Sequence, residues 1–145
     1  MSNPVLVGVN DLFFSAKITG PANVLGVPMK CFPSCDRLLA AAREAGSPPP
    51  LVILDLESVG GDPVSLIRAV KSDEGLKDAR IVAFGRHTNA ETLQAADDAG
   101  ADQVMPRSDF VQVLPDLLRA CADGARTALR AQTAPRAQTG TESSP

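Results

Sequence analysis

Apolar runs alternate with helix-like stretches along most of this chain. The clearest run is 51–56, in which four consecutive apolar residues lead into Asp55. A run that is apolar on both faces is typical of a parallel strand covered by helices. Three prolines before the run disfavour a helix there, and Asp62 and Pro63 behind it suit the N-cap and first position of a helix. Asp55 is therefore predicted at the carboxyl end of a buried strand, where open α/β sheets place their ligands.

The same patterns predict five strands, at 5–9, 27–32, 51–56, 81–84 and 103–105. Four helices are predicted between them, at 11–25, 35–45, 63–72 and 89–99. Pro21 is expected to kink the first helix, or to end it near Thr19. Thr88 and Glu91 have the spacing of a capping box at the start of the fourth helix. After the last strand, Ser108 is expected to cap a turn over 109–113, and Pro115 to begin a final helix that runs towards Arg130.

Five strand–helix units with short connections predict the fold class. We expect an α/β domain with a five-stranded parallel sheet in the order 2-1-3-4-5 and helices on both faces, a flavodoxin-like arrangement. This domain is expected to span residues 1–130. Residues 131–145 consist largely of Ala, Gln, Thr, Pro, Gly and Ser, so a disordered tail is expected there.

Composition narrows the function classes. The formal net charge of -3 offers no electrostatic case for nucleic acid. There is no apolar run of about 18 residues and no basic segment leading into an apolar one, so we expect no membrane span, no signal peptide and a cytoplasmic location. The three cysteines are expected to be reduced thiols, because they form neither a disulfide framework nor a four-ligand zinc set.

Polar and charged residues follow the predicted strands. The carboxyl ends of parallel strands share one edge of a sheet, so we expect these residues to lie close together. They are Asn10, Asp11, Asp55, Glu57, Arg86, His87, Thr88 and Arg107, together with Gly85. Asp11 and Asp55 could hold Mg²⁺ weakly, because this cation takes one or two carboxylates and keeps several waters. No other cofactor is expected.

The spacing of these residues resembles that of receiver domains of two-component response regulators, the chemotaxis receiver in particular. Asp11 and Asp55 are 44 positions apart, Asp55 and Gly85 are 30 apart, and Gly85 and Arg107 are 22 apart. The sequence at 99–102, Ala-Gly-Ala-Asp, is also similar to a stretch common in that family. The resemblance covers residues 4–125. It implies that Asp55 stands at the phosphoacceptor position.

The pocket that the resemblance implies is degenerate at three positions. Asn10 stands where the family has one of two carboxylates, Gly85 where it has Thr or Ser, and Arg107 where it has Lys. The amide reduces the charge available to a cation, the glycine offers no hydroxyl for a phosphoryl group, and a planar guanidinium does not substitute for a compact ammonium. Losses of this kind slow phosphoryl transfer by orders of magnitude.

Each of these residues also has a simpler interpretation. Asp55 could pair with Arg107, where arginine can bind a carboxylate through two parallel bonds, and Asp11 could only cap the first helix. His87 could be a solvated loop residue or a ligand contact, and Thr88 could partly replace the missing hydroxyl. Arg86 and Arg107 could instead bind an anion.

The sequence therefore favours a pseudo-receiver: a signalling domain, not an enzyme, that binds another protein and is not efficiently phosphorylated. The resemblance implies docking of another signalling protein over residues 89–99 and 103–130. One alternative is a conventional receiver that is phosphorylated on Asp55. Another is a small flavodoxin-like enzyme or nucleotide binder, although the loop after the first strand has no glycine to cradle a phosphate.

Overall fold

The computed structural model describes residues 4–133, and residues 123–133 as backbone only. Five strands form one parallel sheet in the order β2-β1-β3-β4-β5, which confirms the predicted fold class and topology. The strands are β1 (Val5–Gly8), β2 (Met29–Phe32), β3 (Leu51–Asp55), β4 (Arg80–Gly85) and β5 (Gln103–Pro106). No helix within the described range is long and apolar enough to cross a membrane.

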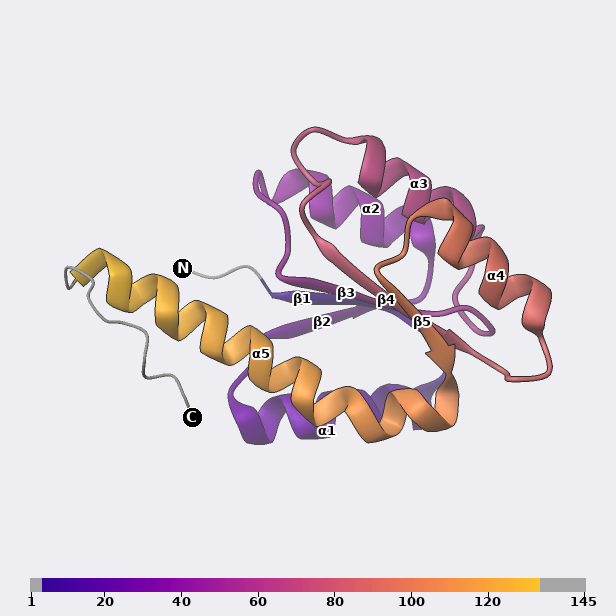
Figure 1. Cartoon of the computed structure of the whole chain (residues 1–145), viewed down its shortest axis with the longest axis horizontal. Coiled ribbons are helices and arrows are strands. Elements are labelled where there is room, and N and C mark those ends of the chain that lie inside the picture. Colours follow the sequence, from indigo (N-terminus) through magenta and orange to yellow (C-terminus); the bar gives the residue numbers. More distant parts are fainter. Residues whose placement is uncertain (1–3, 134–145) are drawn as a thin grey trace.

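Five helices cover the sheet in two layers (Figure 1). They are α1 (Leu12–Leu25), α2 (Cys35–Glu44), α3 (Pro63–Ser72), α4 (Ala90–Ala99) and α5 (Arg107–Thr133). Helices α1 and α5 lie on one face, and α2, α3 and α4 lie on the other. The central strand β3 is buried along its whole length, as the apolar run predicted.

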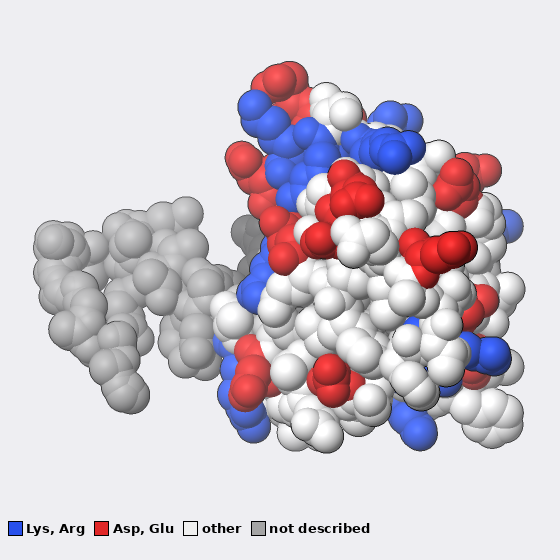
Figure 2. All heavy atoms as spheres, turned by 45° about the vertical axis from the view of Figure 1, so that its right-hand side comes forward, with Lys and Arg blue, Asp and Glu red and all other residues white. Residues whose placement is uncertain are grey.

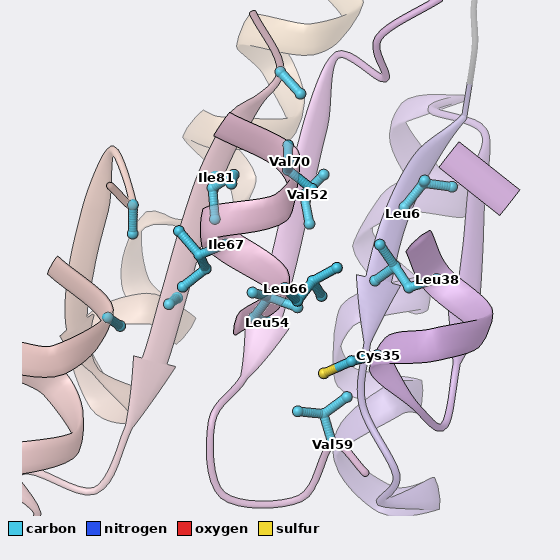
Figure 3. Packing of buried hydrophobic residues seen from close by; sticks show 14 of the residues in the cluster. Leu6, Cys35, Leu38, Val52, Leu54, Val59, Leu66, Ile67, Val70 and Ile81 are labelled. Atoms are coloured by element: carbon cyan, nitrogen blue, oxygen red, sulfur yellow. The ribbon is translucent and has the colours of Figure 1, made fainter. Parts of the chain in front are cut away.

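Alternation along β3 divides the hydrophobic core between the two faces. Val52 and Leu54 belong to the cluster under α2, α3 and α4, whereas Leu51 and Ile53 belong to the cluster under α1 and α5. Figure 3 shows the first cluster, in which Leu66 from α3 lies beside Leu54. Asp55 follows these residues and is carried by the strand to the carboxyl edge of the sheet.

Helix α1 passes through Pro21 without interruption, so the predicted end near Thr19 is wrong. A proline ring clashes with the Cβ of a helical residue before it, and Gly20 has no Cβ. The helix also buries Phe14, Ile18 and Ala22 against the sheet, which favours its continuation.

Helix α5 begins at Arg107 and continues through Pro115, so the predicted turn and restart at Pro115 are wrong. Proline inside a helix costs about 3 kcal/mol, but each large apolar side chain that is fully buried contributes roughly 1.5–3 kcal/mol. Among residues 107–122 of this helix, whose side chains the structure describes, four are buried: Phe110, Leu114, Leu117 and Leu118. The helix extends to Thr133 and so includes the first residues assigned to the tail, while 134–145 lie outside the described residues.

The predicted capping box at the start of α4 is also wrong. The N-cap is Asn89, and its side chain forms no capping hydrogen bond. Its amide donates instead to Glu57 from the β3–α3 loop, at 3.1 Å. A contact between distant segments has thus replaced a local one.

All three cysteines are free thiols, as expected. Cys35 is buried at the start of α2 and is visible in Figure 3. Burial, together with the negative charges of Asp36 and Asp62, raises the pKa of this thiol to about 11. Cys35 is therefore protonated at neutral pH and contributes to the core.

Candidate functional site

The candidate site lies at the carboxyl edge of the sheet, around the end of β3. Asp55 is the last residue of this strand and is fully buried, with 0% of its surface exposed. Strands β1 and β4 lie on either side of β3. Asn10 follows β1 and Gly85 ends β4 at this same edge, and Arg107 enters from the start of α5.

Both carboxylate oxygens of Asp55 accept hydrogen bonds from the chain. Its Oδ1 accepts from the backbone N–H of Glu57 at 3.0 Å, and its Oδ2 accepts from the Ser58 hydroxyl at 2.8 Å. The Ser58 oxygen accepts in turn from the backbone N–H of Asn10 at 3.0 Å. A chain of hydrogen bonds therefore joins the ends of β1 and β3 through Ser58.

Arg107 forms an ion pair with Asp55. Its Nη2 lies 3.9 Å from Asp55 Oδ2, which is an ion-pair distance but too long for a hydrogen bond. The two parallel bonds considered from the sequence are not formed. The guanidinium carbon lies 4.8 Å from the centroid of the Phe14 ring, a cation–π geometry.

An aromatic cluster beneath the guanidinium holds Arg107 in place. The Phe14 ring lies 5.1 Å from that of Phe84, and Phe84 stacks on Phe110 at 4.2 Å. The Nε of Arg107 is buried and has no hydrogen-bond partner among the described residues. Arg107 is thus positioned by aromatic packing and by the charge of Asp55, not by a hydrogen-bond network.

Asp11 caps helix α1. Its Oδ1 accepts from the backbone N–H groups of Phe13 at 3.0 Å and Phe14 at 3.2 Å. This is the capping role that the sequence offered as the simpler interpretation of Asp11.

These residues fit Mg²⁺ poorly as they are arranged. Asp11 uses one oxygen as a helix cap, and the oxygens of Asp55 accept two hydrogen bonds and face a guanidinium. Among the side chains of residues 4–122, no three acidic, histidine or cysteine groups gather closely enough to hold a metal ion. A positive charge 3.9 Å from the central carboxylate also opposes the binding of a second cation.

Gly85 ends β4, and the carboxylate of Glu57 lies beside it. A Cβ at position 85 would come within 3.0 Å of Glu57 Oε2. The same oxygen accepts from the backbone N–H of Arg86 at 3.3 Å and from the amide of Asn89 at 3.1 Å. A side chain at position 85 would therefore require this carboxylate to shift by a few tenths of an ångström.

The loop after Gly85 places its polar residues in solvent. Arg86, His87 and Thr88 are all exposed, whereas Asp55 is buried. The sequence correctly predicted that Asp55 and Arg107 lie close together. It placed Glu57 at this edge of the sheet without assigning it a role. It missed Ser58 and Phe14. Aspartate side chains commonly accept from the backbone N–H two residues on, so the sequence could have indicated the turn from Asp55 to Glu57, but not the bond from the Ser58 hydroxyl.

Neither a protein-family model nor a curated protein matches the sequence. Solved structures are similar to it. The phosphorylated cyanobacterial phytochrome response regulator RcpA has a TM-score of 0.69 at 16% identity, covering 81% of this chain and 91% of its own. The chemotaxis response regulator CheY4 of Vibrio cholerae also has a TM-score of 0.69 at 16% identity, covering 83% of this chain and 99% of its own.

A third similar structure is the receiver domain of the sensor histidine kinase PA1611 from Pseudomonas aeruginosa, with a magnesium ion coordinated in its active-site cleft. Its TM-score is 0.66 at 13% identity, and the match covers 81% of this chain and 98% of that domain. This chain has the receiver fold. Asp55 ends the third strand of this fold in the chain. Its contacts are with Ser58, Glu57 and Arg107.

Proposed function

We propose that this receiver-fold chain is an atypical receiver, a module that binds another signalling protein without efficient phosphorylation of Asp55. The observation that carries the proposal is the state of Asp55, which is 0% exposed and accepts a hydrogen bond on each oxygen. A carboxylate that attacks phosphorus needs a free oxygen in line with the leaving group. Oxygens already held by the chain are poorly placed for this attack.

The groups around Asp55 support the same proposal. Phosphoryl transfer depends on positioned donors and cations that stabilise the charge on the transferred group. Asn10 offers no charge to a metal ion, and Gly85 offers no hydroxyl. Arg107 is a planar fork held over Phe14, so it does not act as a compact, mobile ammonium.

The surface formed by α4, β5 and α5 is the proposed docking face, covering residues 89–99 and 103–130. Strand β5 is at the edge of the sheet and has β4 as its one neighbour. Helix α4 is rich in alanine and buries only Ala96 fully, so its outer side is shallow. Figure 2 shows this side of the molecule, where carboxylates are scattered and Lys and Arg gather mainly at the top of the view.

Phosphorylation by a small-molecule donor tests the first part of the proposal. The protein is incubated with acetyl phosphate and Mg²⁺, and its intact mass is followed over time. We expect little phosphoryl adduct, and faster labelling when Asn10→Asp, Gly85→Thr and Arg107→Lys are combined. Rapid adduct formation in the unmodified chain that Asp55→Asn abolishes would overturn the proposal.

A pair of matched lysine substitutions tests the docking face. Gln94→Lys places a positive charge on the exposed side of α4, and Ala40→Lys places the same charge on the exposed side of α2. In affinity capture from the native lysate, we expect Gln94→Lys to lose a partner that the unmodified chain and Ala40→Lys both retain. Equal retention by both variants would contradict docking at α4.

A conventional phosphoacceptor receiver is the second candidate. The observation that favours it is the placement of Asp55 at the end of the third strand of a fold shared with phosphorylated RcpA. The adduct measurement distinguishes the two candidates, because this one requires efficient labelling of Asp55 in the unmodified chain.

A further inference from the structure

We propose that Glu57 is an internal clamp that fixes the β4–α4 loop, residues 86–89, and the start of α4 without any bound ligand. Any effect of this clamp on the binding of a partner rests on the proposed function, because α4 belongs to the proposed docking face. The clamp itself is a property of the unmodified chain.

The clamp consists of one carboxylate oxygen and two donors from the β4–α4 loop. Glu57 Oε2 accepts from the backbone N–H of Arg86 at 3.3 Å and from the side-chain amide of Asn89 at 3.1 Å. Arg86 directly follows β4, and Asn89 directly precedes α4. The two bonds therefore hold both ends of the loop to a single oxygen.

Gly85 gives the carboxylate its space. A Cβ at this buried position would lie 3.0 Å from Glu57 Oε2 and 3.4 Å from Leu93 Cδ2. The carboxylate would have to shift by a few tenths of an ångström to accept an added methyl group, which would disturb its bonds to the two donors. A glycine at position 85 therefore suits the clamp.

The segment that carries Glu57 is itself firmly held. The Glu57 N–H donates to Asp55 Oδ1 at 3.0 Å. Further along the same loop, the N–H of Gly60 donates to the carbonyl of Pro33 and the N–H of Cys35 donates to the carbonyl of Gly60, both at 2.8 Å. Glu57 therefore projects from a fixed loop, and the loop after β4 is positioned against it.

Asn89 transmits this position to the helix. Its side chain is directed to Glu57 and does not cap α4, while its carbonyl accepts from the N–H of Leu93 at 3.2 Å. The residue at the helix start is thus used for a contact between loops where a local cap was available. The bond from Asn89 to Glu57, made where a capping bond is absent, distinguishes this arrangement from an ordinary helix cap.

Amide hydrogen exchange by NMR, without Mg²⁺ or phosphoryl donor, tests the clamp. Glu57→Ala is expected to increase exchange at the Arg86 amide by about tenfold or more, and to increase it in the first turn of α4. Glu57→Gln keeps an acceptor oxygen and should restore most of the protection. Glu44→Ala, an exposed glutamate at the end of α2, is the matched control and should leave the loop unchanged.

Asn89→Asp is the decisive variant. Aspartate is a better N-cap than an asparagine that does not cap, so a merely local role predicts slower exchange in α4. The clamp predicts faster exchange at Arg86, because a second carboxylate then faces Glu57. Unchanged or slower exchange at Arg86 in this variant would overturn the proposal, as would a uniform increase over the whole chain in Glu57→Ala.

The clamp and the proposed function can fail separately. If Asp55 is labelled efficiently but the Glu57 variants still loosen only the loop and α4, the clamp stands and the pseudo-receiver proposal falls. If Asp55 is not labelled and the Glu57 variants behave like Glu44→Ala, the clamp falls alone.

Discussion

Asp55 has no exposed surface and obtains its partners from the loop that follows it. A buried carboxylate is costly unless hydrogen bonds and a neighbouring charge compensate it. The N–H of Glu57, the hydroxyl of Ser58 and the guanidinium of Arg107 supply this compensation. The same contacts that allow burial of Asp55 also occupy its oxygens.

Ser58→Ala tests this dependence at a single residue. The substitution removes the bond to Asp55 Oδ2 and the acceptor for the N–H of Asn10. Loss of a partner to a buried charged group is expected to lower the free energy of unfolding by about 1–3 kcal/mol. Denaturant titration measures the change.

The matched control for this measurement is Ser65→Ala. Its hydroxyl donates to Asp62 at 2.7 Å, but that pair is exposed. We expect a loss below about 1 kcal/mol there, because water replaces the lost bond. Equal losses in the two variants would contradict a special requirement at Asp55.

At the level of elements, Asp102 ties β4, β5 and α3 together at the opposite edge of the sheet from Asp55. Its Oδ2 accepts from the backbone N–H of Ile81 at 2.7 Å and from Lys71 Nζ at 2.9 Å. Burial alone would raise the pKa of Asp102, but these two bonds and the charges of Lys71 and Arg80 lower it.

Asp102→Ala should therefore destabilise the chain more at pH 7 than in acid. A carboxyl whose pKa is lower in the folded state stabilises the fold above its unfolded pKa of about 3.9, and this contribution is lost as the pH falls through the folded pKa. The substitution also leaves the N–H of Ile81 without its acceptor, at a cost of about 1–3 kcal/mol. Denaturant titrations of the unmodified chain and of Asp102→Ala at pH 7 and pH 3 check this. A difference in the free energy of unfolding that is larger at pH 3 than at pH 7 would contradict it.

The elements that periodicity defines strongly were predictable from sequence. The apolar run of β3 and the stripe of α3 were predicted correctly, because their burial does not depend on distant detail. The succession of five strand–helix units then predicted the sheet and its order. The helices containing Pro21 and Pro115 were not predictable in this way, since the local cost of proline was outweighed by core packing. The start of α4 was missed because Asn89 binds Glu57, which lies 32 positions away in the sequence.

The candidate site shows the same division. Strand spacing brought Asp55, Gly85 and Arg107 to one edge, since parallel strands fix where their ends lie. The roles of Ser58 and Glu57 depend on how a loop folds back, and the cation–π contact depends on which side of α1 presents Phe14. No local pattern contains that information.

At the scale of the whole molecule, the receiver fold is complete within the described residues, and α5 continues beyond the sheet as a long helix (Figure 1). The tail predicted from Ala131 remains a prediction for residues 134–145. Its composition offers little apolar surface to bury.

Truncation before Gln132 tests whether the C-terminal segment contributes to stability. We expect the melting temperature to stay within about two degrees of the full chain, because this polar segment offers little apolar surface to bury. Thermal unfolding followed by circular dichroism measures it. A fall of about 5 °C or more, roughly 1 kcal/mol for a domain of this size, would indicate that the segment packs on the domain.

NMR titration with Mg²⁺ and beryllofluoride, an analogue of a bound phosphoryl group, tests whether Asp55 is held by the chain and is not an efficient phosphoacceptor. We expect no saturable, site-specific amide shifts around Asp55, Gly85 and Arg107 at low-millimolar Mg²⁺. Saturable shifts centred on Asp55 in the unmodified chain, and absent in Asp55→Asn, would contradict it.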